Sequence, residues 1–142
     1  MRYIIAILAL AGVWVSALSL RVHYSNETTP CSINAKWDCD LVNRSPYAEI
    51  KGVPVAAIGI AGYFALAALA LMGQRVMVFL SSLMGLGYAL YLAHIERDVL
   101  MVWCLYCVIS LGVIALITLL SLGWLSFWGI RSKYELHSEV EL

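Results

Sequence analysis

Four long stretches of this chain contain no Asp, Glu, Lys or Arg, and they limit the possible folds more than any other feature. The stretches are Tyr3–Leu20, Val53–Gly73, Val76–Ile95 and Val99–Ile130. Crossing a hydrocarbon core of about 30 Å takes roughly 20 apolar residues in a helix, so each stretch can supply one crossing. A core helix of a soluble protein would carry a polar face instead. The pattern predicts an all-α integral membrane protein, a bundle of four transmembrane helices.

We expect a single membrane domain over residues 1–142. Its predicted parts are helices at about 3–20, 54–73, 76–95 and 99–124 and a loop cap at 21–53. Within the cap, Ser45 followed by Pro46 predicts the start of a short amphipathic helix, with Ser45 as the N-cap residue. The first stretch could instead be a cleaved signal peptide, but its length of about 18 residues exceeds a usual signal-peptide core and favours a retained helix.

The charges are few and balanced. Charged residues make up 13% of the 142 residues and the formal net charge is zero, so no basic surface for nucleic acid is expected. On one predicted side of the membrane, the residues next to the helices are basic: Arg2, Arg75, Arg131 and Lys133. The basic residues of the other side are mixed with acidic ones. Because Lys and Arg near helix ends favour the cytoplasmic side, both termini are predicted to be cytoplasmic.

Small residues recur at intervals of three along the second predicted helix, at Ala56, Gly59, Gly62 and Ala65. This spacing lets helix backbones approach closely in a membrane. We interpret the stripe as a helix-packing seam, and Gly85 and Gly87 of the third helix in the same way.

The chain has four cysteines, Cys31, Cys39, Cys104 and Cys107. The last two form a CxxC near the start of the fourth predicted helix, where the helix N-terminus stabilises a thiolate and lowers its pKa. The loops after the first and third helices face the same compartment, so all four thiols can meet. Cysteines confined to the non-cytoplasmic side indicate an oxidising compartment.

Other interpretations of the cysteines remain open. Free cysteines occur in membrane helices as small apolar residues. A zinc site with four cysteine ligands normally uses pairs two to four residues apart, whereas Cys31 and Cys39 are eight apart, so we expect no metal. Two structural disulfides are also conceivable, and four cysteines allow three pairings. A CxxC more often takes part in thiol–disulfide exchange, which favours a redox function.

The combined pattern resembles the vitamin K epoxide reductase family, particularly its bacterial members that support disulfide formation. The resemblance rests on Cys31 and Cys39 eight residues apart, a serine six residues further on (Ser45), and the segment Glu49–Pro54. It continues through Gly59 and the Gly62-Tyr63 step to the CxxC at the start of the last helix.

This resemblance implies a four-helix bundle around a quinone of the ubiquinone, menaquinone or vitamin K type. Cys107 would be the cysteine nearest the quinone and form an adduct with it, and Cys104 would exchange disulfides with Cys39. Cys31 would meet the partner, a thioredoxin-fold protein with its own CxxC. The residues implied to contact the quinone are Cys107, Ser45, Val55, Ile58, Gly59, Tyr63, Tyr88 and Leu111.

Three further residues are weaker candidates, and two of them have a second interpretation. His94 could protonate a reduced quinone or simply anchor a helix end near the interface. Trp103 and Tyr106 could line the quinone site together with Tyr88, although an interfacial aromatic belt explains Trp103 equally well.

Two departures bear on the reaction. The vertebrate epoxide reductases of the family carry a tyrosine where this chain has Leu111 and an asparagine where it has Val55. Both differences favour quinone reduction over epoxide reduction. The chain ends at Leu142 with a short tail, so the redox partner is expected to be a separate protein.

The leading hypothesis is a quinone-dependent thiol-disulfide oxidoreductase of the bacterial cytoplasmic membrane, with its cysteines on the extracytoplasmic side. It would oxidise its partner and support protein disulfide formation. The alternatives are a vitamin K epoxide or quinone reductase that uses protein thiols, and a non-enzymatic membrane scaffold with structural disulfides.

Overall fold

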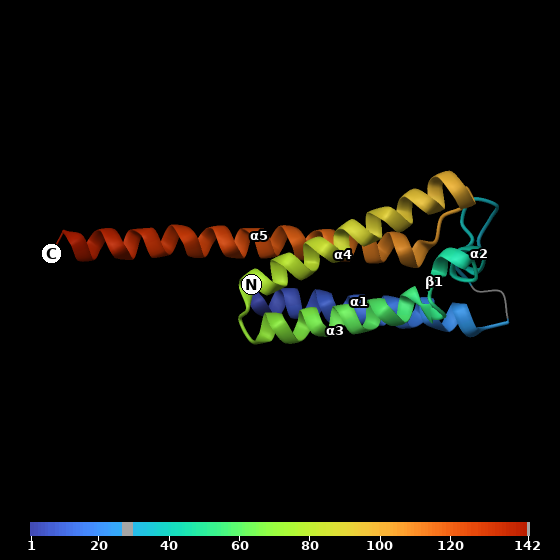
Figure 1. The fold of residues 1–142 in the computed structure, drawn as a ribbon, viewed down its shortest axis with the longest axis horizontal. Helices are drawn as coiled ribbons and strands as arrows, with labels where there is room; N and C mark the ends of the chain where they lie inside the picture. The colour runs from blue at the N-terminus through green and yellow to red at the C-terminus, as the bar shows by residue number, and fades with distance from the viewer. Residues whose placement is uncertain (27–29, 142) are drawn as a thin grey trace.

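The computed structural model describes residues 1–26 and 30–141 and is mostly helical. Its long helices are α1 (Arg2–Tyr24), α3 (Val55–Leu71), α4 (Arg75–Ile95) and α5 (Leu105–Val140). In Figure 1, α1 lies beside α3, and α4 crosses α5. The short elements gather at one end of the bundle, whereas the N-terminus and the α3–α4 turn lie at the other.

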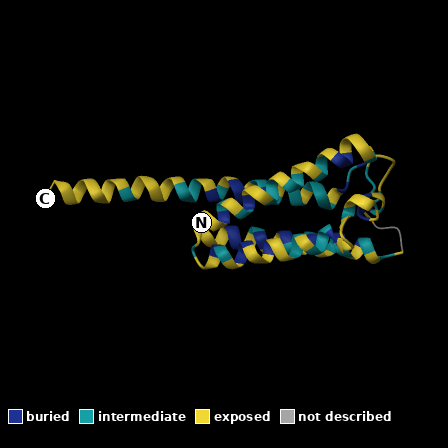
Figure 2. Cartoon of the chain, in the orientation of Figure 1, coloured by how far each residue is buried: buried dark blue, intermediate teal, exposed yellow. Residues whose placement is uncertain are grey.

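Three helical segments are long and apolar enough to cross a membrane: α1 with 23 residues, α4 with its extension to Leu100, and α5 with 36 residues. The fourth, α3, has 17 residues, which corresponds to about 26 Å. Figure 2 shows exposed residues along the outer surfaces of these helices. Many of them are large and apolar, such as Trp14 and Phe64. An outer surface of this kind is what lipid-facing helices present.

The core joins α1, α3 and α5. Ile5 and Ala9 of α1 pack with Tyr63 and Ala70 of α3 and with Ile117 of α5. The hydroxyl of Tyr63 donates a hydrogen bond to the backbone oxygen of Ser110 at 2.9 Å. One aromatic side chain therefore fastens α3 to α5 while its ring packs against α1.

The cap contains less helix than the sequence predicts. A short helix, α2 (Cys39–Asn43), begins after Asp38, whose side chain accepts a hydrogen bond from the backbone N–H of Leu41. The predicted amphipathic helix after Ser45 is only a three-residue 3-10 turn, η1 (Pro46–Ala48).

The chain leaves that turn to form a hairpin. Strand β1 (Glu49–Ile50) pairs antiparallel with β2 (Val53–Pro54). The turn between them places Lys51 and Gly52 at φ values of 52° and 83°. The Ser45 hydroxyl donates to the carbonyl oxygen of Val42 at 2.7 Å and does not cap η1. The helix cannot extend beyond Ala48 because the next residues, Glu49 and Ile50, pair with β2.

The last helix begins later than predicted. Residues Glu96–Leu100 continue α4 as a π-helical turn, η2, and Met101 then reverses the chain in a left-handed conformation with φ of 54°. The next residues are extended because they pair with the cap: the N–H of Trp103 donates to the carbonyl oxygen of Lys36 at 2.7 Å. Helix α5 therefore starts at Leu105 rather than 99, and it continues to Val140 where a polar tail was predicted after 124.

Candidate active site

The four cysteines lie in a row between the cap and the bundle. Cys31 and Cys39 form a disulfide, and Cys104 and Cys107 are free thiols. The sulfur of Cys104 is 3.3 Å from the sulfur of Cys39 and is hydrogen-bonded with the Cys107 thiol. Cys31, Cys39 and Cys104 are all buried. The geometry therefore connects the loop disulfide to Cys107 through Cys104.

Local structure sets the direction of each thiol. Cys39 is the first residue of α2. Cys104 is the N-cap residue of α5, with extended φ and ψ of −99° and 121°, and it follows the bridge between Trp37 and Trp103. Cys107 lies in the first turn of α5. The two thiols of the CxxC consequently leave the chain from different backbone conformations.

Asn43 links the sulfur row to the helices around it. Its side-chain amide donates to the carbonyl oxygen of Cys39 at 2.9 Å and to the sulfur of Cys104 at 3.4 Å. Its side-chain oxygen accepts from the hydroxyl of Ser19, and its backbone oxygen accepts from the ring of His23. These contacts hold the two neighbouring cysteines in position relative to α1.

The hydrogen bond with the Cys107 thiol lowers the pKa of the Cys104 thiol below its ordinary value. The backbone N–H groups of Cys107 and Tyr106 act in the same direction, while burial and the Glu96 carboxylate oppose it. The thiolate of Cys104 is therefore available at a lower pH than that of an ordinary cysteine, and a thiolate is the reactive form in disulfide exchange.

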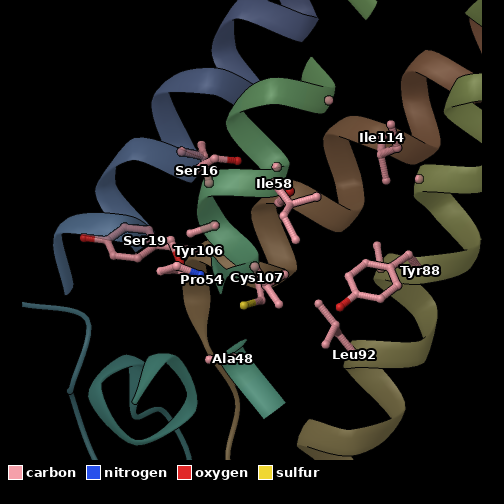
Figure 3. A pocket seen from close by; sticks show the side chains of 18 of the residues that line it. Ser16, Ser19, Ala48, Pro54, Ile58, Tyr88, Leu92, Tyr106, Cys107 and Ile114 are labelled. Carbon is pink, nitrogen blue, oxygen red and sulfur yellow. The ribbon is translucent and has the colours of Figure 1, made fainter. Parts of the chain in front are cut away.

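A cavity of about 550 Å³ lies beyond Cys107, between the cap and helices α1, α3, α4 and α5. Its lining is mainly apolar, with Ile58 from α3 and Leu92 from α4. Figure 3 shows the Cys107 sulfur in this lining, and the hydroxyl of Tyr88 points toward the side on which Cys107 lies. A mainly apolar cavity with a few polar groups is the usual form of a small-molecule site.

The sulfurs of Cys31, Cys39 and Cys104 lie within 4.8 Å of one another. Three close sulfurs could in principle hold a soft metal ion. Two of them are joined in a disulfide, and metal binding requires thiolates. In this oxidation state the cluster is suited to disulfide exchange.

The sequence model described as the vitamin K epoxide reductase family matches residues 3–122. The chain belongs to this family. Members of the vitamin K epoxide reductase family are oxidoreductases, are generally associated with quinone, and generally work with thioredoxin-like partners. The match includes all four cysteines and every residue that lines the cavity.

Most of the residues that the family resemblance assigned to quinone contact line this cavity. They are Ser45, Val55, Ile58, Gly59, Tyr63, Tyr88 and Cys107. Leu111 does not. On α5 the lining residues are Tyr106, Cys107, Ser110 and Ile114, and Leu111 lies at the edge of the helix face that they form.

The small-residue stripe is only in part the predicted packing seam. Ala56, Gly59, Gly62 and Ala65 all line the cavity. A Cβ added at Gly62 would meet nothing within 4 Å, whereas one at Gly59 would lie 3.0 Å from the hydroxyl oxygen of Ser16 on α1. The stripe therefore packs closely against α1 at Gly59, as predicted, and forms the cavity wall at Gly62. Of the other two glycines, Gly85 packs against Ile114 as predicted, and Gly87 has open space beside it.

The remaining predicted candidates divide in two. Tyr106 lines the cavity, and Trp103 lies in the extended segment before it. The side chain of His94 is 70% exposed and its Nδ1 lies 2.8 Å from an oxygen of Asp98. His94 is therefore a helix-end residue outside the cavity lining.

Sequence reasoning missed Asn43 and Glu96. Both are buried polar residues in the cavity lining. Asn43 has the composition of an ordinary loop residue, and the sequence around it gives no indication that it is buried. Glu96 did carry one, because an ionisable residue at the end of a long apolar stretch indicates a functional site by default.

Proposed function

We propose that this vitamin K epoxide reductase family member is a disulfide-forming thiol–quinone oxidoreductase of the bacterial type. It would oxidise a thioredoxin-fold partner and reduce quinone. The proposal rests mainly on one geometric fact: the Cys39 sulfur is 3.3 Å from Cys104, whose neighbour Cys107 lines the cavity. Electrons delivered to the loop disulfide have a short path to a mainly apolar chamber.

The thiol steps follow from this order. A partner thiolate attacks Cys31, the Cys31–Cys39 bond breaks, and the second partner thiol completes the partner's disulfide. Cys39 thiolate then attacks Cys104 in a Cys104–Cys107 disulfide and releases Cys107 as a thiolate, which takes up a proton given up by the partner's thiols. Attack of Cys31 on Cys39 restores the loop disulfide and leaves Cys104 reduced. Two electrons have then moved from the partner to the CxxC. The result, an oxidised loop pair and a reduced CxxC, is the state of the cysteines in this structure.

Cys31 would be the residue that meets the partner, yet it is 3% exposed. Reaction with a protein thiol needs a line of approach to its sulfur. Partner binding therefore has to uncover Cys31.

The chemistry of the cavity fits a quinone. Val55, Ile58 and Gly59 of α3 would hold the ring on one side and Tyr88 of α4 on the other, with Cys107 beside it. When bound, a quinone accepts two electrons and two protons. An apolar tail would leave along the side of the lining where Gly62, Ala65 and Met84 are exposed.

The proposed topology has four membrane crossings, with α3 as the shortest. The N-terminus and the α3–α4 turn lie at the end of the bundle opposite the cap, and α5 extends past that end. Arg2 begins α1, Arg75 begins α4, and the last part of α5 contains Arg131 and Lys133. The positive-inside rule then favours cytoplasmic termini and an extracytoplasmic cap. The cysteines would face the oxidising side of a bacterial cytoplasmic membrane.

The test is anaerobic quinone reduction by the purified protein in detergent, with a reduced thioredoxin-fold protein as electron donor. We expect turnover in the wild type and in Ser126→Ala, a control on the exposed surface of α5, and none in Cys107→Ala or Cys104→Ala. Cys107→Ala should still form mixed disulfides with the donor, because the loop pair is unchanged.

Quinone turnover that survives Cys107→Ala would refute the assigned path. Thiol trapping with a maleimide reagent tests the scaffold alternative. Cysteines that remain in fixed pairs under both reducing and oxidising donors, with no quinone reduction, would instead support a structural scaffold.

A further inference from the structure

Glu96 is a buried carboxyl group that the thiol steps leave without a role. It is the first residue of η2, is only 3% exposed, and lines the cavity. Within residues 1–26 and 30–141, no Lys, Arg or His lies within ion-pairing distance of it. Burying a carboxylate without a cation is costly, and ionisable groups at such positions usually act in proton movement.

The contacts of Glu96 are with the CxxC. Its Oε2 accepts a hydrogen bond from the backbone N–H of Cys104 at 3.1 Å, its carboxyl group interacts with the Cys107 thiol, and both residues line the same cavity. The backbone oxygen of Glu96 accepts from the N–H of Val102 at 3.2 Å, which ties η2 to the segment that leads into α5. Backbone hydrogen bonds therefore hold the Glu96 carboxyl group next to the CxxC.

We propose that Glu96 is the catalytic proton acceptor for Cys107. As the sulfur becomes a nucleophile, its S–H bond breaks and an O–H bond forms on the carboxylate, while the electron pair stays on sulfur. The net charge of the pair is unchanged by this transfer. That matters in an apolar cavity, because release of the proton to water would leave two buried negative charges. The role in turnover rests on the proposed function, but the proton transfer itself does not.

The other titratable groups that line the cavity are poorly suited to this task. Tyr47, Tyr63, Tyr88 and Tyr106 each offer a phenol hydroxyl, a group that more readily donates a proton than takes one. His23 is bonded to Asn43 and to Glu49 of β1, with its Nε2 2.9 Å from the Glu49 carboxylate. Glu96 is the carboxylate in the lining, and a general base must lie within hydrogen-bond reach of the proton it takes.

The first test uses no quinone and no partner. In a Cys104→Ala background with the loop disulfide formed, Cys107 is the sole free thiol, and its alkylation by iodoacetamide is followed between about pH 6 and 8. With Glu96 present, the pair shares one proton, so the rate should change little with pH. With Glu96→Gln, the thiolate forms only by proton loss to solvent, and the rate should rise about tenfold per pH unit.

One check and one further variant keep the test decisive. Glu96→Gln retains an oxygen for the Cys104 N–H, and formation of the Cys31–Cys39 disulfide checks its fold. Should it fail to fold, Glu96→Asp withdraws the carboxylate by one methylene and should lower the rate while keeping the weak pH dependence. Equal pH slopes with and without the carboxylate would overturn the proposal.

Quinone turnover then gives a second, separable result. With the CxxC intact, Glu96→Gln should lower quinone reduction by about 10²-fold or more, the usual contribution of a general base. Turnover at the wild-type rate would also overturn the role of Glu96. If the wild type itself does not reduce quinone, the proposed function fails, whereas the alkylation profile still decides whether Glu96 takes the Cys107 proton.

Discussion

Replacing Gly12 with alanine tests how tightly α1 packs against the wall of the cavity. A Cβ added at residue 12 would lie 2.5 Å from two carbons of the Tyr63 ring, whereas carbon atoms in favourable contact are about 3.5–4.0 Å apart. The ring must therefore move by about 1 Å. Its hydroxyl is held on Ser110, 2.9 Å from the carbonyl oxygen and 2.8 Å from the side-chain hydroxyl, so the move strains both contacts.

Three contributions set the change in the free energy of unfolding. Overpacking costs about 1–3 kcal/mol, and each hydrogen bond lost at Ser110 costs about 1 kcal/mol. The better helix propensity of alanine offsets about 1 kcal/mol. We expect Gly12→Ala to lower the free energy of unfolding by about 1–4 kcal/mol. Gly62→Ala is the matched control: its Cβ meets nothing within 4 Å, so it should leave stability unchanged or raise it by up to about 1 kcal/mol.

The assay is reversible unfolding by SDS in mixed detergent micelles, followed by circular dichroism. A double-mutant cycle with Tyr63→Leu isolates the contact, because without the ring the alanine at residue 12 should lose most of its cost, about 1–3 kcal/mol. If Gly12→Ala is as stable as Gly62→Ala, or if the two substitutions act additively, then Tyr63 is not confined between α1 and Ser110 and the reasoning is wrong.

Two further predictions concern the thiols and the cavity. Because the hydrogen bond with Cys107 lowers the pKa of Cys104, Cys107→Ala should move the midpoint of Cys104 alkylation to higher pH and reduce its thiolate near pH 7; an unchanged midpoint, measured by peptide mass spectrometry, would contradict the assigned cause. Gly62→Phe should place a ring in the cavity and weaken quinone binding about tenfold or more with the loop disulfide intact. Gly87→Phe, outside the cavity lining, is its control. Quinone binding is measured by the quenching of Trp fluorescence, and an equal loss of quenching in both variants would argue against this cavity as the site.

The long-range features of the fold could be predicted because they depend on simple physics. Hydrocarbon excludes charge, so the uncharged stretches locate the apolar helices closely, as α1 and α4 illustrate. Loop parity predicted only that the four thiols can meet, and the approach of Cys39 to Cys104 was implied by the family resemblance. The pairing of Cys31 with Cys39 did not follow from parity either, since four cysteines allow three pairings and the choice depends on how the cap folds.

The features that were mispredicted depend on contacts distant in sequence. The late start of α5 results from the bridge between Trp37 and Trp103, and no local pattern reports that a cap strand will pair there. The small-residue stripe through Gly59 and Gly62 has the same appearance whether another helix or a cavity faces it. Leu111 is outside the cavity lining for a more local reason, because it lies at the edge of the α5 face that carries Cys107 and Ser110.

The start of α5 also determines what the CxxC can do. In a continuous helix, residues three apart lie on one face, so Cys104 and Cys107 would both have pointed either to the cap or to the cavity. Because the helix begins at Leu105, Cys104 is extended and reaches the Cys39 sulfur at 3.3 Å, while Cys107 lies in the helical turn that lines the cavity. The same break leaves the N–H of Cys104 free to bind Glu96, which brings a carboxylate to the thiol that faces the cavity. A shift of the helix start by one turn would therefore separate the two halves of the proposed relay and remove its proton acceptor together.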